Sequence, residues 1–449
     1  MSLTHPHINT ERLIKASIKN CIPNKNQFYS FDKTKCFDTK KESVIEYGLP
    51  LSNDAALCGT AFDYLARFIV ARIVSDNKDA VLKKLVAERF ITSSSFYTIT
   101  IDDKTKKKYE SKSIRMSIPG GVLRGNVYAH NYWKSICDIP LDEIEKLMSK
   151  GKIIINDLSI DETKKIRATL RRKYRKLLTP IEKYINGETV DESSLIDTCL
   201  ILSKMELTVR GGIGVIEISN LFISNSNDTV IKNELTKMLD SFKKTFLPLI
   251  NEDSEVVYNP HFGIGSQIIG GADADIFIDG TLYDFKTSIK NGWSSSDVTQ
   301  LIGYFILDAV AKKCDCKENW LSAYTIKKVA LYKVRYEEIA FFDISEISSN
   351  LLENTLKNIC CTYLMRNMSH LISDKKLNTI KSKYNFPLTK KELRFCSDMY
   401  AEDLNDFLED GDNLPNFLKK ERDEIQRSHY TLKIFLDSID IFSFFRDVV

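Results

Sequence analysis

The chain has 449 residues, of which 43% are hydrophobic and 28% charged, and its formal net charge is +3. The length points to two or three structural units, and the composition is that of a globular protein with a sizeable core. The small net charge excludes the global positive field of a histone-like binder, so any nucleic acid must be held by local patches.

The cysteines and the apolar pattern indicate a cytoplasmic, soluble protein. Ten cysteines are present, among them Cys314-Asp-Cys316 and the adjacent Cys360 and Cys361. They show neither the spacing of a disulfide framework nor the paired knuckles that a zinc site needs. The N-terminus lacks the apolar segment of a signal peptide, and no run of about 18 apolar residues occurs. We therefore expect reduced thiols and no membrane partner.

The first 150 residues predict a mixed α/β region. Residues 1–55 are polar and give few signals, whereas apolar residues recur at helical spacing within 61–90. Residues 95–117 alternate as a β-hairpin does, around the polar turn Asp102-Asp-Lys-Thr-Lys106. Pro119-Gly-Gly121 then breaks the pattern, and a helical stretch with loops follows to about residue 150.

Residues 161–184 predict a helix with one apolar stripe and a basic remainder. The stripe consists of Ile166, Leu170, Tyr174, Leu177, Leu178 and Ile181. The cations are Lys164, Lys165, Arg167, Arg171, Arg172, Lys173, Arg175 and Lys176. Only Glu182 offsets them between Lys164 and Lys183. Such a surface is either a solvated face or a ridge that follows nucleic-acid phosphates, with Lys164, Arg167, Arg171 and Arg175 as the candidate contacts.

The rest of the chain alternates helices and strands and then becomes helical. We expect helices at 191–209, 227–247, 296–312 and 346–361, a run of strands over 255–287, and a strand over 327–336. The last 90 or so residues read as all-helical, with a loop near 410–415. No internal repeat, low-complexity linker or nucleotide-binding glycine loop is present.

The segment from Asp273 to Lys286 carries the clearest chemical signal. Asp279-Gly280 is a strong signal for a two-residue hairpin turn. Its register sets Asp275 opposite Asp284, and Asp273 opposite Lys286. Side chains alternate between the two faces of a strand, so these four polar residues share a face with Phe277 and Leu282. The opposite face carries Ala274, Ile276, Ile278, Thr281, Tyr283 and Phe285, as packing on a core requires.

Two carboxylates directly opposite each other destabilise a sheet unless something neutralises them. A divalent cation does so, because hard oxygen ligands suit Mg²⁺ or Mn²⁺. A lysine on the same face can hold or deprotonate water, or stabilise leaving charge, during metal-assisted hydrolysis of a phosphodiester. The alternative is a surface hairpin with an Asp273–Lys286 ion pair and the other two carboxylates in water.

These residues resemble the PD-(D/E)xK nuclease superfamily in its RecB-like branch. Gly270-Gly-Ala-Asp-Ala-Asp275 resembles the strand with the first metal-binding Asp, and Asp284-Phe-Lys286 the D-x-K element. Gln300-Leu-Ile-Gly-Tyr304 is similar to the Q-x-x-x-Y motif of that branch. Asn259-Pro-His-Phe262 and Gly59-Thr-Ala-Phe-Asp-Tyr64 resemble an uncharacterised bacterial group within the superfamily. The likeness covers roughly residues 55–340, with Val329–Arg335 as the last core strand.

The resemblance implies roles for single residues. Asp275 and Asp284 would be metal ligands together with the Phe285 carbonyl, Lys286 would be the catalytic lysine, and Gln300 and Tyr304 would support it. An acidic residue from an earlier helix completes such sites, and Glu206 is our candidate, with Glu217 as runner-up. Arg210, one helical turn after Glu206, would pair with it or with a phosphate. Asp273 is the second choice for the metal-binding Asp, and His261 is a lesser candidate.

The expected architecture is an α/β restriction-endonuclease-like core, with a mixed sheet in αβββαβ order and helical additions at both ends. We divide the chain into a mixed region 1–155, a nuclease core 156–345 and a helical region 346–449. The cysteine spacing departs from that of the iron–sulfur members of the branch, so we expect no cluster.

The expected function is Mg²⁺- or Mn²⁺-dependent hydrolysis of DNA, or else of RNA, in phage defence or DNA repair. One alternative is a non-catalytic nucleic-acid-binding module that keeps the fold. Another is a partner-binding protein or homo-oligomer that associates through its helical C-terminal region.

Overall fold

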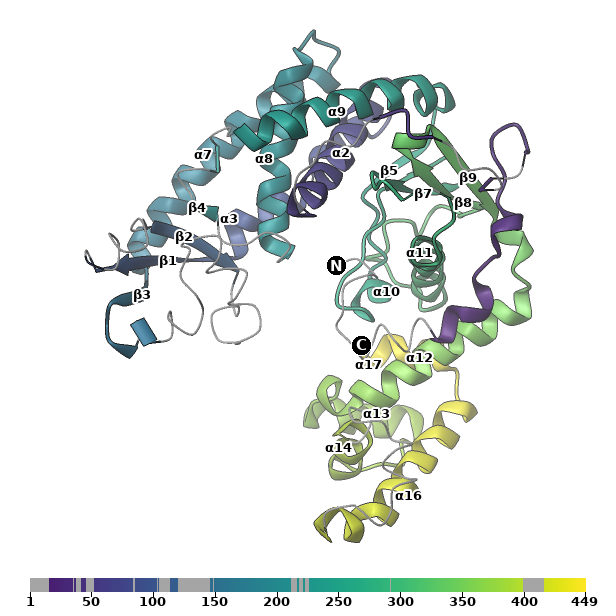
Figure 1. Cartoon of the computed structure of the whole chain (residues 1–449). Coiled ribbons are helices and arrows are strands. Elements are labelled where there is room, and N and C mark those ends of the chain that lie inside the picture. The colour runs from purple at the N-terminus through teal and green to yellow at the C-terminus, as the bar shows by residue number, and fades with distance from the viewer. Residues whose placement is uncertain are drawn as a thin grey trace.

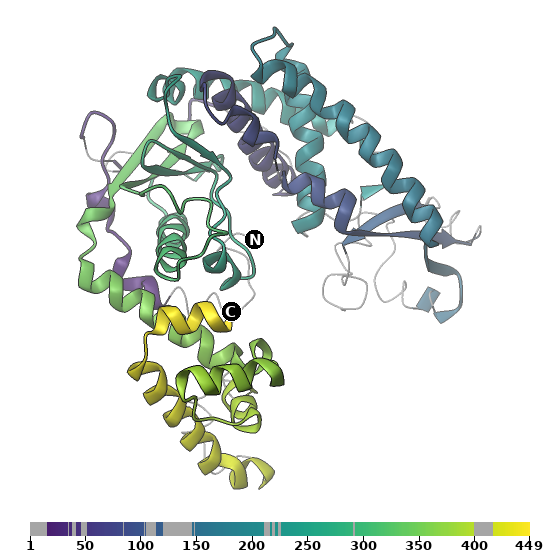
Figure 2. The same cartoon turned by 180° about the vertical axis from the view of Figure 1, so that it is seen from behind.

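The protein is mixed α/β and forms an open arch around a five-stranded sheet (Figures 1 and 2). The computed structural model describes residues 16–34, 36–37, 42–45, 52–83, 85–102, 104, 114–119, 146–147, 149–210, 216–217, 221–222, 226–290, 292–398 and 416–449. The expectation of an α/β protein with a mixed sheet is confirmed.

The five-stranded sheet positions the predicted site. Its strands are β5 (Val256–Tyr258), β6 (Ile276–Ile278), β7 (Thr281–Lys286), β8 (Lys328–Lys333) and β9 (Glu338–Asp343), in that order across the sheet. All neighbours are antiparallel except β7 and β8, which are parallel. Helix α11 (Ser295–Lys313) connects this parallel pair, because parallel strands need a crossover. The sequence does not predict β9, which forms an edge of the sheet.

The predicted hairpin register is confirmed from the turn as far as the pair Ile276 and Tyr283. Ile278 pairs with Thr281 and Phe277 with Leu282. Asp279 and Gly280 both have positive φ, 47° and 82°, as a two-residue turn that matches the strand twist requires. Both faces of the hairpin are buried, however, because Phe277 and Leu282 belong to one apolar cluster and Ile276 and Tyr283 to the other. The polar residues must therefore gather at one end of the strands.

One face of the sheet is covered by a helical bundle. It contains α2 (Ser52–Ile73), α7 (Ile160–Ile185), α8 (Glu192–Arg210) and α9 (Ser226–Thr245). Phe242 and Phe246 of α9 contact Phe285 of β7, with ring centroids 5.9 and 5.3 Å apart. The basic helix α7 begins at a capping box of Ser159 and Glu162, which agrees with the predicted start.

Helices α10 (Ile264–Gln267) and α11 cover the other face, and the C-terminal helices lie beyond α11. A Cβ on Gly265 would lie 2.2 Å from the carbonyl oxygen of Leu307, so only glycine lets α10 approach α11 so closely. The C-terminal region is helical, as predicted. Its helices are α12 (Ser349–Leu371), α13 (Asp374–Tyr384), α14 (Lys390–Asp398), α16 (Asn416–Ser438) and α17 (Ile441–Val448).

A second, antiparallel sheet lies at the far end of the bundle. Its order is β3 (Ile153–Asp157), β1 (Ser94–Ile101), β2 (Ile114–Pro119) and β4 (Ile216–Glu217). The pairing of β1 with β2 confirms the hairpin predicted over 95–117. Most of its turn, Gly120-Gly121 and the stretch 122–145 lie outside the described residues, as do the loops 211–215 and 410–415.

The helix predicted over 61–90 is wrong in its second half, because α2 ends at Ile73 and short turns and α3 (Arg89–Ser93) follow. The 3₁₀ turns within the described residues are Lys19–Cys21, Lys25–Gln27, Lys78–Leu82, Val86–Glu88, Leu247–Leu249, Val334–Tyr336 and Ile344–Glu346. The three-part division stays a prediction, although α2 packs into the same core as α8 and α9 and Tyr29 pairs with Phe341 of β9. Within the described ranges, no helix combines the length and apolarity needed to cross a membrane.

Candidate active site

Asp275, Asp284 and Lys286 meet at one end of the β6–β7 hairpin. Nζ of Lys286 lies 2.7 Å from Oδ2 of Asp284, and Asp284 is only 2% exposed. Asp275 directly precedes β6, and its Oδ2 accepts a hydrogen bond of 2.5 Å from the backbone N–H of Phe285. The three residues predicted to share a site therefore do so, with two carboxylates and one ammonium drawn from adjacent strands.

Helix α11 supplies the next two predicted residues. Lys286 donates from Nζ to Oε1 of Gln300 at 3.0 Å, and Gln300 donates from Nε2 to the hydroxyl of Tyr304 at 2.6 Å. Gln300 and Tyr304 are both buried and, being four residues apart, lie on one face of the helix. The expected support of Lys286 by this pair is present in the structure.

The electrostatics of the pair of carboxylates are unfavourable. Burial and the nearby Asp284 raise the pKa of Asp275 to about 7. Burial also raises the pKa of Asp284, and Lys286 only partly offsets this rise. The contact of Lys286 with Oδ2 of Asp284 is an ion pair without hydrogen-bond geometry, so this buried oxygen has no hydrogen-bond donor among the described residues. A site of this kind has unmet capacity for positive charge.

Lys286 is held as a cation. Burial alone would lower its pKa, but the carboxylate of Asp284 raises it above the ordinary value for lysine. Asp297, in the first turn of α11, acts in the same direction. The side chain therefore stays protonated at neutral pH and can serve as a donor.

Asp63 of α2 is a third carboxylate that the sequence reading missed. Its pKa lies well above the ordinary range, because of burial and of the negative charge on Asp275, while Arg67 acts in the opposite sense. The carboxylate makes no hydrogen bond or ion pair with any residue that the structure describes. The signal was present, since Asp63 belongs to the segment Gly59–Tyr64 that resembles the bacterial group, but no local pattern gave it a role.

The N-terminal half of α2 is held against the end of β7. A Cβ on Gly59 would lie 3.1 Å from Oγ1 of Thr287, the residue after Lys286. Phe62 contacts Phe285 with ring centroids 5.9 Å apart. Asp63 follows Phe62 directly, and this packing carries it to the carboxylates of the hairpin.

Glu206 of α8 lies beside the cluster, but its charge is already compensated. Arg210 Nε lies 2.8 Å from its Oε1, and Tyr64 donates its hydroxyl proton to Oε2 at 2.5 Å. Arg210 also lies 2.6 Å, through Nη2, from Oδ2 of Asp273. Of the two alternatives for Arg210, the structure therefore has the pairing with Glu206.

The prediction that Asp273 faces Lys286 is wrong. The pairing of β6 with β7 ends at Ile276 and Tyr283, and Asp273 instead bridges to His261 on the β5 side. Its carboxylate binds Arg210, which lowers the pKa of Asp273 against the effect of burial. His261 accepts a hydrogen bond at Nδ1 from Gly263 N–H and contacts Trp320, which is a structural arrangement.

The remaining predicted residues lie elsewhere. Glu217 is in β4 of the four-stranded sheet, paired along the backbone with Met116 of β2. Lys164, Arg171 and Arg175 are exposed on α7, and Arg167 is half-buried there. These cations belong to a helix that packs against α2 and α8 and not to the carboxylate cluster.

The donors fit Mg²⁺ or Mn²⁺ in type and charge, since all are hard oxygens and one buried oxygen of Asp284 lacks a hydrogen bond. In the described part of the chain, no three His, Cys, Asp or Glu side chains are arranged to hold a metal ion as they stand. The set implied by the resemblance uses only two such side chains, Asp275 and Asp284, with the Phe285 carbonyl as third donor.

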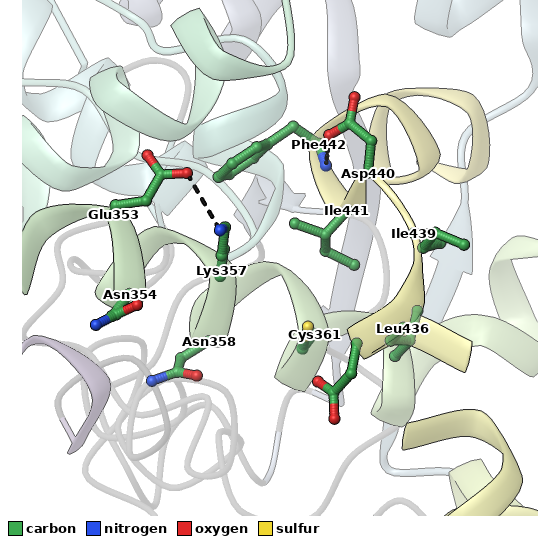
Figure 3. A pocket seen from close by; sticks show the side chains of 11 residues that line it. Glu353, Asn354, Lys357, Asn358, Cys361, Leu436, Ile439, Asp440, Ile441 and Phe442 are labelled. Atoms are coloured by element: carbon green, nitrogen blue, oxygen red, sulfur yellow. Dashed lines mark hydrogen bonds and ion pairs between the residues drawn. The ribbon is translucent and has the colours of Figure 1, made fainter. Parts of the chain in front are cut away.

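A separate cavity of about 530 Å³ lies in the C-terminal region between α12 and the segment joining α16 to α17 (Figure 3). Glu353, Lys357, Asp437 and Asp440 contribute charges of both signs to its wall. Glu353 pairs with Lys357 at 3.5 Å and with Lys313 at 2.8 Å. Glu353 is thus compensated by two lysines, and the cavity does not include the predicted active-site residues.

Comparisons of this chain with protein-family models, with characterised proteins and with solved structures find no match. The interpretation of the site rests on its residues and their geometry.

Proposed function

We propose that this protein is a metal-dependent nuclease that hydrolyses phosphodiester bonds of DNA. The observation that supports it most is the pair of half-buried Asp275 and buried Asp284 beside Lys286, which α11 holds through Gln300. Two carboxylates whose pKa values are raised by burial destabilise the folded chain unless a cation compensates them. A chain that keeps such an arrangement gains from it through binding or catalysis.

Asp275, Asp284 and the Phe285 carbonyl would hold the divalent cation, and Asp63 lies close enough to influence their charge. A bound Mg²⁺ or Mn²⁺ would polarise a phosphoryl oxygen as a Lewis acid. Glu206 is less suited to be a ligand, because Arg210 and Tyr64 already occupy its two oxygens. Asp63, rather than Glu206, would therefore add negative charge beside the metal, through its interaction with Asp275 and Asp284.

Lys286 acts as a fixed donor and not as a base. Its raised pKa keeps the ammonium charged, and the hydrogen bond to Gln300 fixes its direction. A preorganised cation of this kind stabilises negative charge that develops on the phosphate or on the leaving oxygen. Tyr304 orients the amide of Gln300 and so acts on Lys286 indirectly, through Gln300.

The element order supports a restriction-endonuclease-like core. Helix α9 is followed by β5, β6, β7, α11 and β8, which corresponds to the expected αβββαβ order, with the short helix α10 inserted between β5 and β6 and with β9 added at the edge. DNA as substrate, and a role in phage defence or repair, rest on the resemblance to the PD-(D/E)xK superfamily.

The test is a cleavage panel with labelled duplex DNA, single-stranded DNA and RNA, in Mg²⁺, in Mn²⁺ and in EDTA. We expect DNA cleavage that requires the metal and falls by about 10²- to 10³-fold in Lys286→Ala, the usual effect of removing a preorganised charge donor. Lys290→Ala, which removes an exposed lysine from the following loop, is the matched control. No cleavage of any substrate, or cleavage unchanged in Lys286→Ala, would refute the proposal.

A second candidate is a nucleic-acid-binding protein without catalysis, and the exposed cations of α7 favour it. It predicts DNA binding that persists in Asp284→Ala, together with no metal-dependent cleavage by the wild type.

A further inference from the structure

Helix α7 presents two parallel rows of cations to solvent. An α-helix has 3.6 residues per turn, so Lys164, Arg171 and Arg175 fall in one row, and Lys165, Arg172 and Lys176 fall in the neighbouring row. All six side chains are exposed. The opposite side of the helix buries Leu170, Tyr174, Leu178 and Ile181 against the bundle.

These charges lack the acidic partners that a solvated helix face normally has. No Asp or Glu lies between Glu162 and Glu182, and only Lys164 has an ion pair, at 3.7 Å from Asp161. The other five have no partner among the described residues. Like charges four residues apart, such as Arg171–Arg175 and Arg172–Lys176, repel each other and destabilise the helix. On α9, by contrast, Lys232 pairs with Asp197 at 2.5 Å.

The face lacks the aromatic platforms that single-strand binders use for base stacking. Tyr174 is buried, and Lys173 lies over the ring of Phe222 at 4.8 Å. From Lys164 to Arg175 the helix rises about 16 Å. The chemistry presented is therefore positive charge spaced along a line, suited to the backbone of a duplex.

We infer that the outward face of α7 binds the phosphate backbone of duplex nucleic acid, as an anchoring surface separate from the carboxylate site. This inference rests on the proposed function, because it takes nucleic acid as the substrate. In both views α7 runs along the outer border of the arch, while its apolar side packs on α2 and α8, the helices that carry Asp63 and Glu206 (Figures 1 and 2). The surface holds duplex nucleic acid without reading its bases.

The test measures equilibrium binding of a fluorescein-labelled duplex in EDTA, which prevents cleavage. The full-length wild type is compared with the triple variant Lys165→Gln, Arg172→Gln, Lys176→Gln. The control removes three exposed cations from other helices, Lys237→Gln, Lys375→Gln and Arg394→Gln. Each phosphate contact makes the slope of log K against log salt about 0.9 more negative. With three contacts removed, we expect the slope of the α7 variant to be about 2.7 less negative than that of the wild type. The control keeps the wild-type slope and affinity.

Circular dichroism and thermal melting establish that both variants are folded before binding is measured. Equal affinities of the α7 variant and the control would overturn the inference. So would tighter binding of single strands than of duplex, or binding of phosphatidylglycerol vesicles with none of duplex. Salt-dependent duplex binding without cleavage in Mg²⁺ would refute the nuclease proposal and leave this inference standing. Cleavage with an unchanged salt slope in the α7 variant would refute this inference alone.

Discussion

Lys286 donates a hydrogen bond from Nζ to Oε1 of Gln300, across the gap between β7 and α11, at 3.0 Å. The other end of the same amide donates to Tyr304, so the orientation of Gln300 is fixed by its own helix. The strand β7 and the crossover helix α11 together therefore fix the position of Lys286. Among the described residues, its ammonium is the only positive charge directly beside Asp284.

Tyr304→Phe removes the hydroxyl that orients Gln300 and leaves the ring in place. We expect kcat for DNA cleavage to fall by about 10- to 100-fold with little change in KM, because Tyr304 acts through Gln300 and not on the substrate. The free energy of unfolding falls by about 1 kcal/mol, the usual net value of one hydrogen bond. Steady-state kinetics and urea unfolding measure the two effects. A change in KM alone would contradict this role.

In the metal-free protein, Asp275 contributes stability that is lost as pH rises. The pKa of Asp275 is raised from 3.8 to about 7 by burial and by Asp284. A raised folded-state pKa gives stability that is complete below the unfolded value and is lost as pH rises through the folded value. Between pH 4 and 7, Asp275→Asn therefore becomes progressively more stable than the wild type, by up to about 4 kcal/mol, since one pKa unit is worth about 1.4 kcal/mol.

The measurement is urea unfolding in EDTA at several pH values, with Asp240→Asn, an exposed carboxylate of α9, as the matched control. The Asn side chain can still accept the Phe285 N–H hydrogen bond, so the comparison isolates the charge. If the stability difference between Asp275→Asn and the wild type does not vary with pH, the negative charge on Asp275 does not destabilise the folded state.

Asp63→Asn is expected to weaken Mn²⁺ binding more than Glu206→Gln does. The Asp63 carboxylate has no partner among the described residues, whereas Glu206 is compensated by Arg210 and Tyr64. We expect at least a tenfold loss of affinity in Asp63→Asn, or about 1.4 kcal/mol. Calorimetric titration of both variants and of Asp240→Asn measures it. The reverse order would restore Glu206 as the acidic residue of the site.

Arg210→Ala is expected to destabilise the fold. The guanidinium lies between Glu206 and Asp273, at 2.8 and 2.6 Å, and its removal leaves two carboxylates with little exposure unpaired. Breaking such an ion pair costs about 3 kcal/mol or more. Arg210→Lys keeps the charge but not both contacts, so its stability falls between that of the wild type and that of Arg210→Ala. If chemical denaturation shows no loss of stability while DNA affinity falls, Arg210 is instead a phosphate contact.

The register of the hairpin could be predicted from the sequence because it is set locally. Asp279-Gly280 permits the positive φ values of the turn, and the pairing of Phe277 with Leu282 follows from it. Gln300 and Tyr304 could be placed on one helix face for the same reason. Asp273 was misplaced because the register was extended beyond the point where β6 begins, at Ile276.

Asp63 could not be assigned a role from local pattern. Helical spacing identifies α2 as a buried helix, but the position of Asp63 at the carboxylates depends on how α2 docks against β7. That docking depends on contacts between distant segments, such as Gly59 with Thr287 and Phe62 with Phe285. Likewise, the sequence predicts that Arg210 pairs with Glu206 or with a phosphate, and the structure adds Asp273 as a further partner.

The most direct test of the central claim is a Mn²⁺ titration followed by electron paramagnetic resonance at pH 8, on folded wild type, Asp284→Asn and Asp240→Asn. If Asp275 and Asp284 hold a divalent cation beside Lys286, the wild type and Asp240→Asn bind a Mn²⁺ ion that Asp284→Asn loses. Equal Mn²⁺ binding by Asp284→Asn and the wild type would contradict the account.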